Sequence, residues 1–424
     1  MMGRPSPKHY PKLRDLASLE FNQIPDLMKV LSLCIVACIS PLMGICLAFA
    51  FFCKAPTRRN AVICAIGIGA AAALSAYGIR YKSPTDMTRW MDECRYYTGK
   101  SFLMIPNSSN PDHSGLLVWN LMCWLVGNVG DLYLLQSLAA FLGYGLVFWL
   151  PMRAYANRDI SLRQFNYTLL FLFLAIPTQV IVGNVRSALG CILCSIAFCT
   201  RKSYDVKRSI PGFVIIAVAC LIHSSMVLGL VVYVLQPLIS HHPIKLSVLV
   251  AICLFVFFSC SPVLAESHLL SEVPIVSRIL EKASFYTVGT EWDQQEAKNI
   301  LSIASHVFGI FLLGLVCLRA LFCKKRDNLF AVTILMVLCV VSMETTLANV
   351  GNRLQYIPIV TGSLLMLDEE SAKAERYKRL LEWVSRLMMI IAFVVCLISM
   401  RRFVPTFNYP RVLLSMVFYP SLFF

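Results

Sequence analysis

The sequence predicts an all-α polytopic membrane protein, with about 10–12 transmembrane or re-entrant helices and two larger extracytoplasmic loops. Of its 424 residues, 58% are apolar and only 14% are charged, whereas about a quarter of the residues in a soluble domain are charged. Apolar runs of about 20 residues, long enough to cross a bilayer, recur along the chain. The Lys and Arg residues, which give a formal net charge of +15, lie mainly in short loops between these runs. That distribution is typical of a membrane protein and argues against nucleic acid as a partner.

The expected helices follow the apolar runs. One run is interrupted in its middle by His223-Ser224-Ser225, which indicates a broken or re-entrant hairpin with His223 at its tip. Residues 1–29 form a polar, basic leader, residues 30–404 a single membrane domain, and residues 405–424 an apolar, aromatic tail. In chain order, the expected helical segments are Val30–Cys53, Ala61–Ile79, Leu116–Val126, Leu132–Leu150, Tyr167–Val182, Ala188–Cys199, Ile210–Leu235, Leu246–Cys260, Leu301–Cys323, Leu329–Leu347, Leu354–Leu367 and Leu387–Val404.

The basic loops set the expected orientation, because cytoplasmic loops of membrane proteins carry an excess of Lys and Arg. The basic leader would then lie outside, against this rule, and we base the expected orientation on the five internal loops. The loops placed inside are 54–60, 151–166, 200–209, 324–328 and 368–386. The segments placed outside are the loop Arg80–Ser114, the turn 183–187, the loop Ser261–Asn299 and the turn Asn352-Arg353.

The stretch from Gly183 to Ser225 carries the polar residues that a lipid-facing surface would tolerate least. An ionisable side chain at membrane depth costs a few kcal/mol, so we expect Arg186 and His223 to face the protein interior. The Arg186 guanidinium suits phosphate oxygens, although an arginine at a helix end can also extend its head group to the interface. Asn184 can cap the following helix. His223 can act as a base towards a hydroxyl, oriented by Ser225, or it can simply form a hydrogen bond between helices.

Further candidates lie in the segments that we place outside. Asp86 follows the second apolar run, in a loop rich in Tyr, Trp and Arg, and is either a second candidate base or a solvated loop carboxylate. Trp90 can stack on a sugar ring, although Trp also marks any membrane interface. Arg353, close to Tyr356 in the sequence, is open to the same two interpretations as Arg186.

The cysteines do not indicate a metal centre. The chain has 17 of them, mostly inside apolar runs, where Cys behaves as a small hydrophobic residue. Cys191 and Cys194 lie three positions apart on one expected helix, but no second pair or flanking His accompanies them in the sequence. We therefore expect a protein that uses no metal and no other cofactor.

In their order along the chain, these motifs resemble those of the EpsG-type, Wzy-like family of bacterial exopolysaccharide and O-antigen polymerases. The resemblance runs from about the first expected span to Leu367, and it departs from the family pattern at two positions. Met87 stands where family members usually have Tyr, and Ser187 stands where they usually have Gln. The matching residues are Arg80, Tyr81, Thr85, Asp86, Asn184, Arg186, Ala188, His223, Ser225, Arg353 and Tyr356.

The resemblance implies an enzyme, a membrane-embedded glycosyltransferase that polymerises undecaprenyl-diphosphate-linked oligosaccharide repeat units into exopolysaccharide or O-antigen. It implies a multi-pass protein of the bacterial inner membrane that acts at the outer face. A chain-length regulator and other polysaccharide-assembly proteins would be its partners, beside the bilayer and the polyprenyl-diphosphate-linked oligosaccharide. The implied catalytic residues are His223, Asp86 and Arg186, and the implied substrate-binding residues are Arg353, Asn184, Arg80, Tyr81, Trp90, Ser225 and Tyr356.

Two other functions would use the same residues. A flippase or transporter of lipid-linked oligosaccharide would hold the diphosphate with these arginines and do no chemistry, and the inverted repeat typical of such proteins is not visible in the sequence. An O-antigen ligase would differ from a polymerase only in its acceptor. His223 separates the enzyme from the transporter, because an amide cannot take up a proton near neutral pH and His223→Gln should therefore abolish long polymer.

Overall fold

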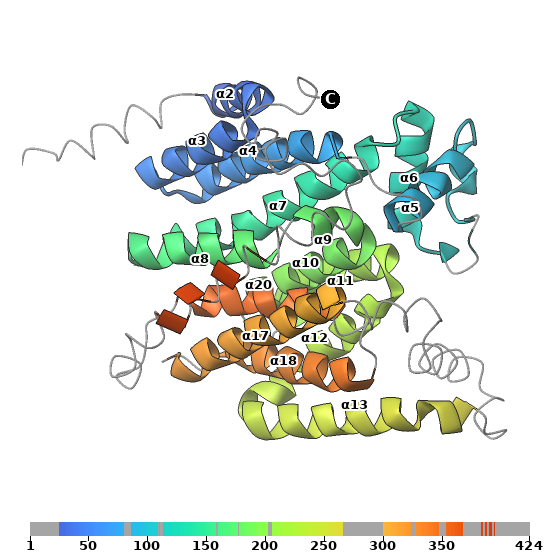
Figure 1. The fold of residues 1–424 in the computed structure, drawn as a ribbon, viewed down its shortest axis with the longest axis vertical. Coiled ribbons are helices and arrows are strands. Elements are labelled where there is room, and N and C mark those ends of the chain that lie inside the picture. Colours follow the sequence, from blue (N-terminus) through green and yellow to red (C-terminus); the bar gives the residue numbers. More distant parts are fainter. Residues whose placement is uncertain are drawn as a thin grey trace, which may run out of the picture.

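The structure is a computed structural model that describes residues 25–79, 86–108, 110, 113–157, 160–176, 178–201, 206–265, 300–323, 327–346 and 353–367, with isolated positions from 383 to 394. Its elements are helices (Figure 1), as the sequence predicts. They are α2 (Asp26–Ile39), α3 (Pro41–Lys54), α4 (Arg58–Tyr77), α5 (Asp86–Tyr96), η1 (Phe102–Met104), α6 (Leu117–Val129), α7 (Leu134–Tyr155), α8 (Leu162–Ala175), α9 (Thr178–Gly183), α10 (Val185–Thr200), α11 (Val206–Ile222), η3 (Ser224–Met226), α12 (Val227–His241), α13 (Pro243–Ala265), α17 (Ile300–Phe322), α18 (Asn328–Thr346) and α20 (Tyr356–Leu365).

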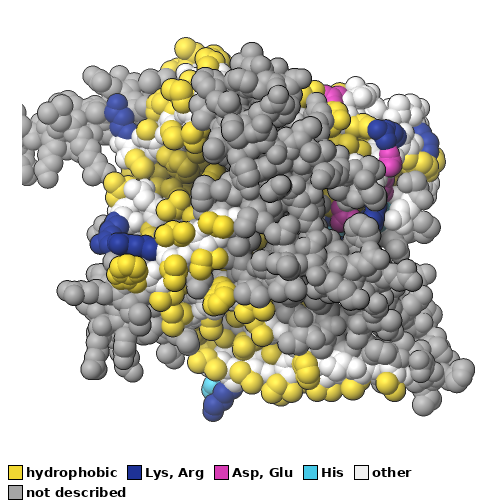
Figure 2. Space-filling model, in the orientation of Figure 1, with side chains coloured by type: hydrophobic (Ala, Val, Ile, Leu, Met, Phe, Trp, Pro, Cys, Tyr) yellow, Lys and Arg dark blue, Asp and Glu magenta, His cyan; other side chains and the backbone are white. Residues whose placement is uncertain are grey.

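Three helical stretches within the described residues are long and apolar enough to cross a membrane, namely Arg58–Tyr77, Leu134–Tyr155 and Ser224–His241. The other apolar helices are shorter over the parts that the structure describes. Figure 2 shows hydrophobic side chains in a band from the top of one face to its lower edge, with Lys and Arg at the left and bottom edges and mixed charges at the upper right. On α13, Leu249, Ile252 and Val256 are each more than half exposed, which fits contact with lipid. The number of membrane crossings stays a prediction.

The first apolar run forms two helices, and the prediction of one span over Val30–Cys53 was wrong. α2 ends at Ile39 and α3 begins at Pro41. The Ser40 hydroxyl accepts a hydrogen bond from the backbone N–H of Met43 at 3.3 Å, and a proline at the first helical position loses no intrahelical bond. The Ser40-Pro41 pair therefore starts a new helix. Because α2 begins at Asp26, the end of the predicted leader is also helical.

α4 and α7 form a closely packed antiparallel pair. Arg58 at the start of α4 donates to Asn157, just beyond the end of α7. At the opposite end, Gln136 of α7 donates to the carbonyl of Ala76 in α4 at 2.6 Å. A Cβ on Gly69 would lie 2.7 Å from a backbone oxygen of α7, so this small residue allows the close approach. Residues 54–60 and 151–157, which belong to two segments predicted to lie inside, are thus at one end of the pair.

Most residues of α10 are buried, and the helix packs against α7, α11 and α20. α11 ends at Ile222, and η3 then leads into α12, so the helix is interrupted at His223 as predicted. The Tyr233 hydroxyl of α12 donates to the carbonyl of Ser209 in α11 at 3.1 Å. The interrupted run is therefore a hairpin, and His223 lies at its turn.

α20 lies deep in the bundle, with all of its residues buried. It is linked to α18 by a hydrogen bond from Thr333 to Thr361 at 3.0 Å. Just before α20, the Arg353 carbonyl accepts a hydrogen bond from the Cys191 thiol of α10 at 3.3 Å. This contact brings the turn before α20 to the N-terminal half of α10. Most of the predicted helix Leu387–Val404, and all of the tail 405–424, lie outside the described residues.

Candidate active site

The site is built on a helical hairpin formed by α5 and α6, beside the start of α10. A Cβ on Gly127 of α6 would lie only 2.1 Å from the carbonyl oxygen of Cys94 in α5. Glycine at this position therefore lets the two helices touch through their backbones. Met87, Met91 and Cys94 form the buried face of α5, an amphipathic pattern that packs this short helix against the rest of the protein.

The loop between α5 and α6 is fixed by side chains of α6. The buried Asn120 amide donates to the carbonyls of Ile105 at 2.9 Å and His113 at 3.2 Å. Trp124 donates from its ring N–H to the carbonyl of Lys100 at 2.9 Å. Because these bonds hold the loop backbone at three points, the imidazole of His113 has a defined position against the hairpin.

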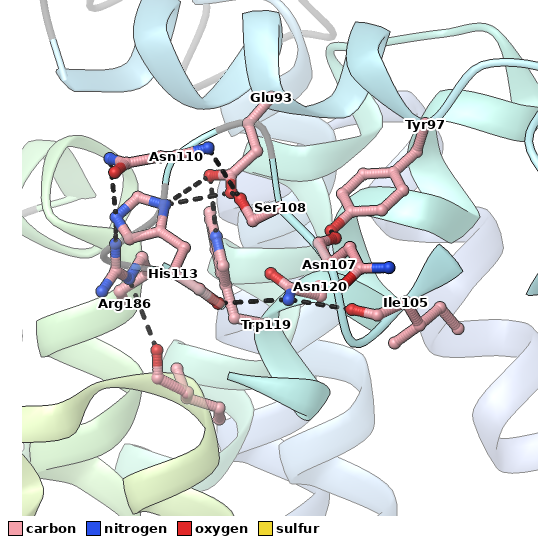
Figure 3. Close-up of polar contacts among 11 residues, drawn as sticks. Glu93, Tyr97, Ile105, Asn107, Ser108, Asn110, His113, Trp119, Asn120 and Arg186 are labelled. Carbon is pink, nitrogen blue, oxygen red and sulfur yellow. Dashed lines mark hydrogen bonds and ion pairs between the residues drawn. The ribbon is translucent and has the colours of Figure 1, made fainter. Parts of the chain in front are cut away.

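Glu93 is a carboxylate enclosed within this hairpin, and its residue is only 4% exposed. Its oxygens lie 2.9 and 3.0 Å from Nδ1 of His113, and they accept hydrogen bonds from Trp119 Nε1 at 3.0 Å and from the Ser108 hydroxyl (Figure 3). Burial raises the pKa of Glu93, but the hydrogen bonds from His113, Ser108 and Trp119 more than offset it, so the pKa lies below its ordinary value. Glu93 is therefore a buried carboxylate that stays ionised.

Arg186 extends from the first turn of α10 into the same cluster and is only 8% exposed. Its Nη1 contacts Nε2 of His113, and its Nε donates to the carbonyl of Ile222 at 3.4 Å (Figure 3). Its guanidinium carbon lies 5.6 Å from the centre of the Trp119 ring, within range of a cation–π interaction. Ile222 is the last residue of α11, so Arg186 donates to a buried carbonyl that has no partner within its own helix.

Arg186 and His223, which the sequence singled out together, lie near each other at the turn of the α11–α12 hairpin. Arg186 bonds the carbonyl of Ile222, the residue directly before His223. Nδ1 of His223 accepts a hydrogen bond from the backbone N–H of Ser225 at 3.2 Å, and it lies 2.7 Å from the Ser225 hydroxyl. Ser225 therefore contacts the imidazole, and His223 also caps η3.

Asn184 occupies the N-cap position of α10, but the capping bond suggested by the sequence is not formed by its side chain. Its backbone angles, φ −121° and ψ 45°, lie outside the extended region typical of a capping residue. Its carbonyl instead accepts hydrogen bonds from the Ser187 hydroxyl at 3.2 Å and from the Ala188 N–H at 2.9 Å.

The remaining sequence-predicted residues differ in their depth and in their contacts. Asp86, in the first turn of α5, forms an ion pair at 3.6 Å with Arg89, and both side chains are at least a third exposed. The Trp90 ring packs edge-to-face on Trp119, with ring centres 5.6 Å apart. Tyr356 is buried in the first turn of α20. Arg80 and Tyr81 lie outside the described residues.

The sequence did not point to His113 and Trp119, which contact the Arg186 guanidinium, or to Glu93, which contacts both of them. Glu93 had a detectable signal, because it lies within the amphipathic segment DMTRWMDECRY, next to the buried Cys94. A carboxylate on the enclosed side of such a helix is unusual and needs a partner. His113 had no comparable signal in the sequence, since it lies in a loop and meets Arg186 only through the tertiary fold.

Among the residues that the structure describes, no group of three or more His, Cys, Asp and Glu side chains could hold a metal ion. The described cluster instead combines one guanidinium, one carboxylate, imidazole and indole, groups suited to binding an anion and moving a proton.

Comparison with known proteins assigns the chain to a family. No curated protein and no solved structure matches it. The model of the EpsG family matches residues 75–411, a range that includes α5, α6 and α10 and so the whole cluster around Arg186. Because this match covers more than half of the 424 residues, the chain belongs to the EpsG family, as its sequence motifs indicated.

Proposed function

We propose that this protein polymerises undecaprenyl-diphosphate-linked oligosaccharide repeat units into exopolysaccharide or O-antigen at the outer face of the bacterial inner membrane. The observation that carries the proposal is the position of Arg186, a buried guanidinium next to an imidazole that is backed by a carboxylate. Membership of the EpsG family supports a polysaccharide polymerase over other membrane proteins with a buried arginine.

The reaction needs a group that holds the leaving diphosphate and a group that activates the acceptor. The acceptor hydroxyl forms a new bond to the anomeric carbon of the donor sugar, while the bond from that carbon to the diphosphate oxygen breaks. The electron pair leaves with the diphosphate, whose growing charge is stabilised by a preorganised guanidinium. Arg186 suits this role, and Arg353 is a second candidate, since its backbone lies beside Cys191 of α10. The proton of the hydroxyl goes to a base, for which the sequence offers His223 and Asp86.

The remaining predicted residues would bind the sugar and lipid parts of the substrate. Trp90 packs on Trp119, next to the Arg186 guanidinium, so its ring is placed to stack on a sugar of the repeat unit. Asn184 lies at the start of α10 and Tyr356 at the start of α20. A multi-pass inner-membrane location with a chain-length regulator and other polysaccharide-assembly proteins as partners completes the proposal.

The test compares Arg186→Lys with Arg59→Lys, a change at an exposed arginine in α4 that pairs with Asp26. A lysine keeps the charge but cannot make two parallel hydrogen bonds to a diphosphate. We expect Arg186→Lys to reduce the amount of long polymer about 100-fold, the typical effect of losing one transition-state donor. Arg59→Lys should leave polymer unchanged.

Two observations separate the polymerase from the other two functions: the side of the membrane on which unused repeat units accumulate, and the transfer of finished polymer. In the Arg186→Lys strain, single lipid-linked units should accumulate on the outer face, where an impermeant glycan label reaches them. Accumulation on the inner face would identify a flippase and overturn the proposal. Loss of polymer transfer to its final acceptor, with polymer length unchanged, would identify a ligase.

A further inference from the structure

We propose that His113, held by Glu93, is the base that takes the proton from the acceptor hydroxyl, and that the Arg186–His113 contact is a resting arrangement that the donor diphosphate breaks. This proposal rests on the proposed polymerase function and names the residues that carry out its proton transfer. The choice between His113 and His223 as the base depends on which ring nitrogen of each one accepts hydrogen bonds.

The ring of His113 has its acceptor nitrogen directed at Arg186 (Figure 3). Nε2 contacts Nη1 of Arg186 and lies 3.5 Å from the amide nitrogen of Asn110. A guanidinium can only donate hydrogen bonds, so Nε2 must supply its lone pair to Arg186. In the neutral ring the proton is then on Nδ1, which donates to Glu93 at 2.9 Å. A carboxylate that fixes the tautomer in this way leaves the other nitrogen as the basic one.

His223 is held in the opposite tautomer. Its Nδ1 accepts a hydrogen bond from the backbone N–H of Ser225 at 3.2 Å, so in the neutral ring the proton is on Nε2. With the proton on Nε2, that nitrogen can donate a hydrogen bond but cannot accept a proton. The geometry therefore favours His113 over His223 as the base.

Donor binding can expose Nε2 of His113 by exchanging the partner of Arg186. A hydrogen bond from a guanidinium to a diphosphate oxygen joins two opposite charges and can be one of a parallel pair, so it is stronger than a single bond to a neutral imidazole nitrogen. The diphosphate should therefore displace Nε2 of His113 from the Arg186 guanidinium. Nε2 then needs a new donor, because an unpaired acceptor in this enclosed site is costly. The acceptor hydroxyl supplies that donor.

The transfer then proceeds with atoms and charges balanced. The hydroxyl proton moves to Nε2 of His113 as the oxygen attacks the anomeric carbon, and the diphosphate leaves with its electron pair against Arg186. The imidazolium that forms lies against the Glu93 carboxylate, which is already ionised and held by Trp119 and Ser108. Glu93 touches neither substrate in this arrangement, so it is a positioning residue.

The test measures donor binding and turnover separately for His113→Gln. The purified protein in nanodiscs is titrated with undecaprenyl diphosphate, and polymer formation is followed with a lipid-linked repeat unit. His113→Gln should bind undecaprenyl diphosphate at least as tightly as the wild type, since Arg186 loses a competing partner. Its turnover should fall by about 10² to 10⁴, the usual cost of removing a general base.

Three further variants and one control variant complete the experiment. Glu93→Gln should also retain donor binding and lose turnover, whereas Arg186→Lys should lose donor binding. His223→Gln should keep more than a tenth of the turnover, and not lose long polymer as the sequence alone led us to expect, because Nδ1 of His223 accepts from Ser225 and the Gln amide still donates a hydrogen bond. His242→Gln, at an exposed histidine beyond the end of α12, is the matched control and should behave as the wild type.

The outcomes that overturn the proposal are distinct from those that overturn the polymerase function. Normal turnover in His113→Gln, or loss of turnover and diphosphate binding together, would mean that His113 only supports Arg186. Loss of turnover in His223→Gln with normal turnover in His113→Gln would return the base to His223. If the wild-type protein forms no polymer from bound donor, the proposed function itself fails.

Discussion

α10 carries an arginine at each end, and the two are held in contrasting ways. Arg201, just beyond the C-terminal end, donates to the carbonyl of Tyr233 and to Gln236 Oε1, and its guanidinium lies 4.2 Å from the centre of the Tyr233 ring. Its positive charge lies at the negative end of the helix dipole, where it is stabilising. Its described hydrogen bonds are made to neutral groups of α12, which suits a purely structural contact.

Arg186 lies at the opposite end, where the helix dipole opposes its charge. Its contacts with His113 and Trp119 come from the α5–α6 hairpin rather than from a packed core helix. A buried charge at the unfavourable end of a helix is a cost to the fold, and such a cost is typical of a functional site. The comparison indicates that burial alone does not identify a functional arginine, whereas the nature of its partners does.

The largest effect should come from separating Arg186 from the α5–α6 hairpin. In Gly127→Ala the new methyl group would lie 2.1 Å from the Cys94 carbonyl oxygen, so α5 and α6 must move apart. Overpacking of this kind costs about 1–3 kcal/mol or more. We expect little or no binding of undecaprenyl diphosphate and no polymer, measured on purified protein and in cells.

The matched control is Gly314→Ala in α17, where a Cβ would have no atom within 4 Å among the described residues. This variant should bind and polymerise as the wild type. Normal donor binding by Gly127→Ala would show that the hairpin does not shape the site, and would remove the contrast between the two ends of α10.

A second prediction tests the two arginines directly. Arg201→Met removes the described donor to the Tyr233 carbonyl and to the buried Gln236, which should cost about 1–3 kcal/mol of unfolding free energy. Its thermal unfolding midpoint in detergent should fall, while the folded fraction still binds undecaprenyl diphosphate. Arg186→Met should show the opposite result, with donor binding lost and the midpoint less affected.

Both measurements are made on the same preparations, so that each variant controls for the other. If Arg201→Met lost donor binding at an unchanged unfolding midpoint, the C-terminal end of α10 would also belong to the binding site. The two arginines would then share one role.

The smallest effect concerns the pH dependence of stability through Glu93. A carboxyl group whose pKa is lower in the folded than in the unfolded protein stabilises the fold above its unfolded pKa, about 4.3, and this contribution is lost as the pH falls through the folded pKa. The pKa of Glu93 is lowered, because its hydrogen bonds with His113, Ser108 and Trp119 outweigh the effect of burial. The wild type should therefore be more stable than Glu93→Gln at pH 7.

The difference in unfolding midpoint between the wild type and Glu93→Gln should be constant near neutral pH and should shrink below about pH 4.3. Asp92→Asn, at an exposed carboxylate of the same helix that pairs with Arg95, is the control and should show a smaller difference. A difference that grew as the pH fell would mean that Glu93 is protonated in the folded protein.

Local sequence features determined the helical architecture. The apolar runs, the basic loops and the His223-Ser224-Ser225 interruption predicted the helices and the hairpin, because helix formation depends on neighbouring residues and on the apolar length that a bilayer requires. Arg186 was identified for the same reason, since a charge at the end of an apolar segment, in a short turn between two such segments, is conspicuous in the sequence. The first span was predicted wrongly because the capping effect of Ser40-Pro41 was not weighed against the apolar run.

Only the tertiary structure decided which groups surround Arg186. Glu93 and His113 come from a helix and a loop that precede α10 by more than 70 positions in the chain. The contact of His113 with Arg186, and through His113 the link to Glu93, depends on how the α5–α6 hairpin docks. No local pattern encodes that docking, because it results from backbone contact at Gly127 and from the loop bonds made by Asn120. The tautomers of His113 and His223 follow from the same packing, because the partner that the fold places beside each ring nitrogen decides which nitrogen carries the proton.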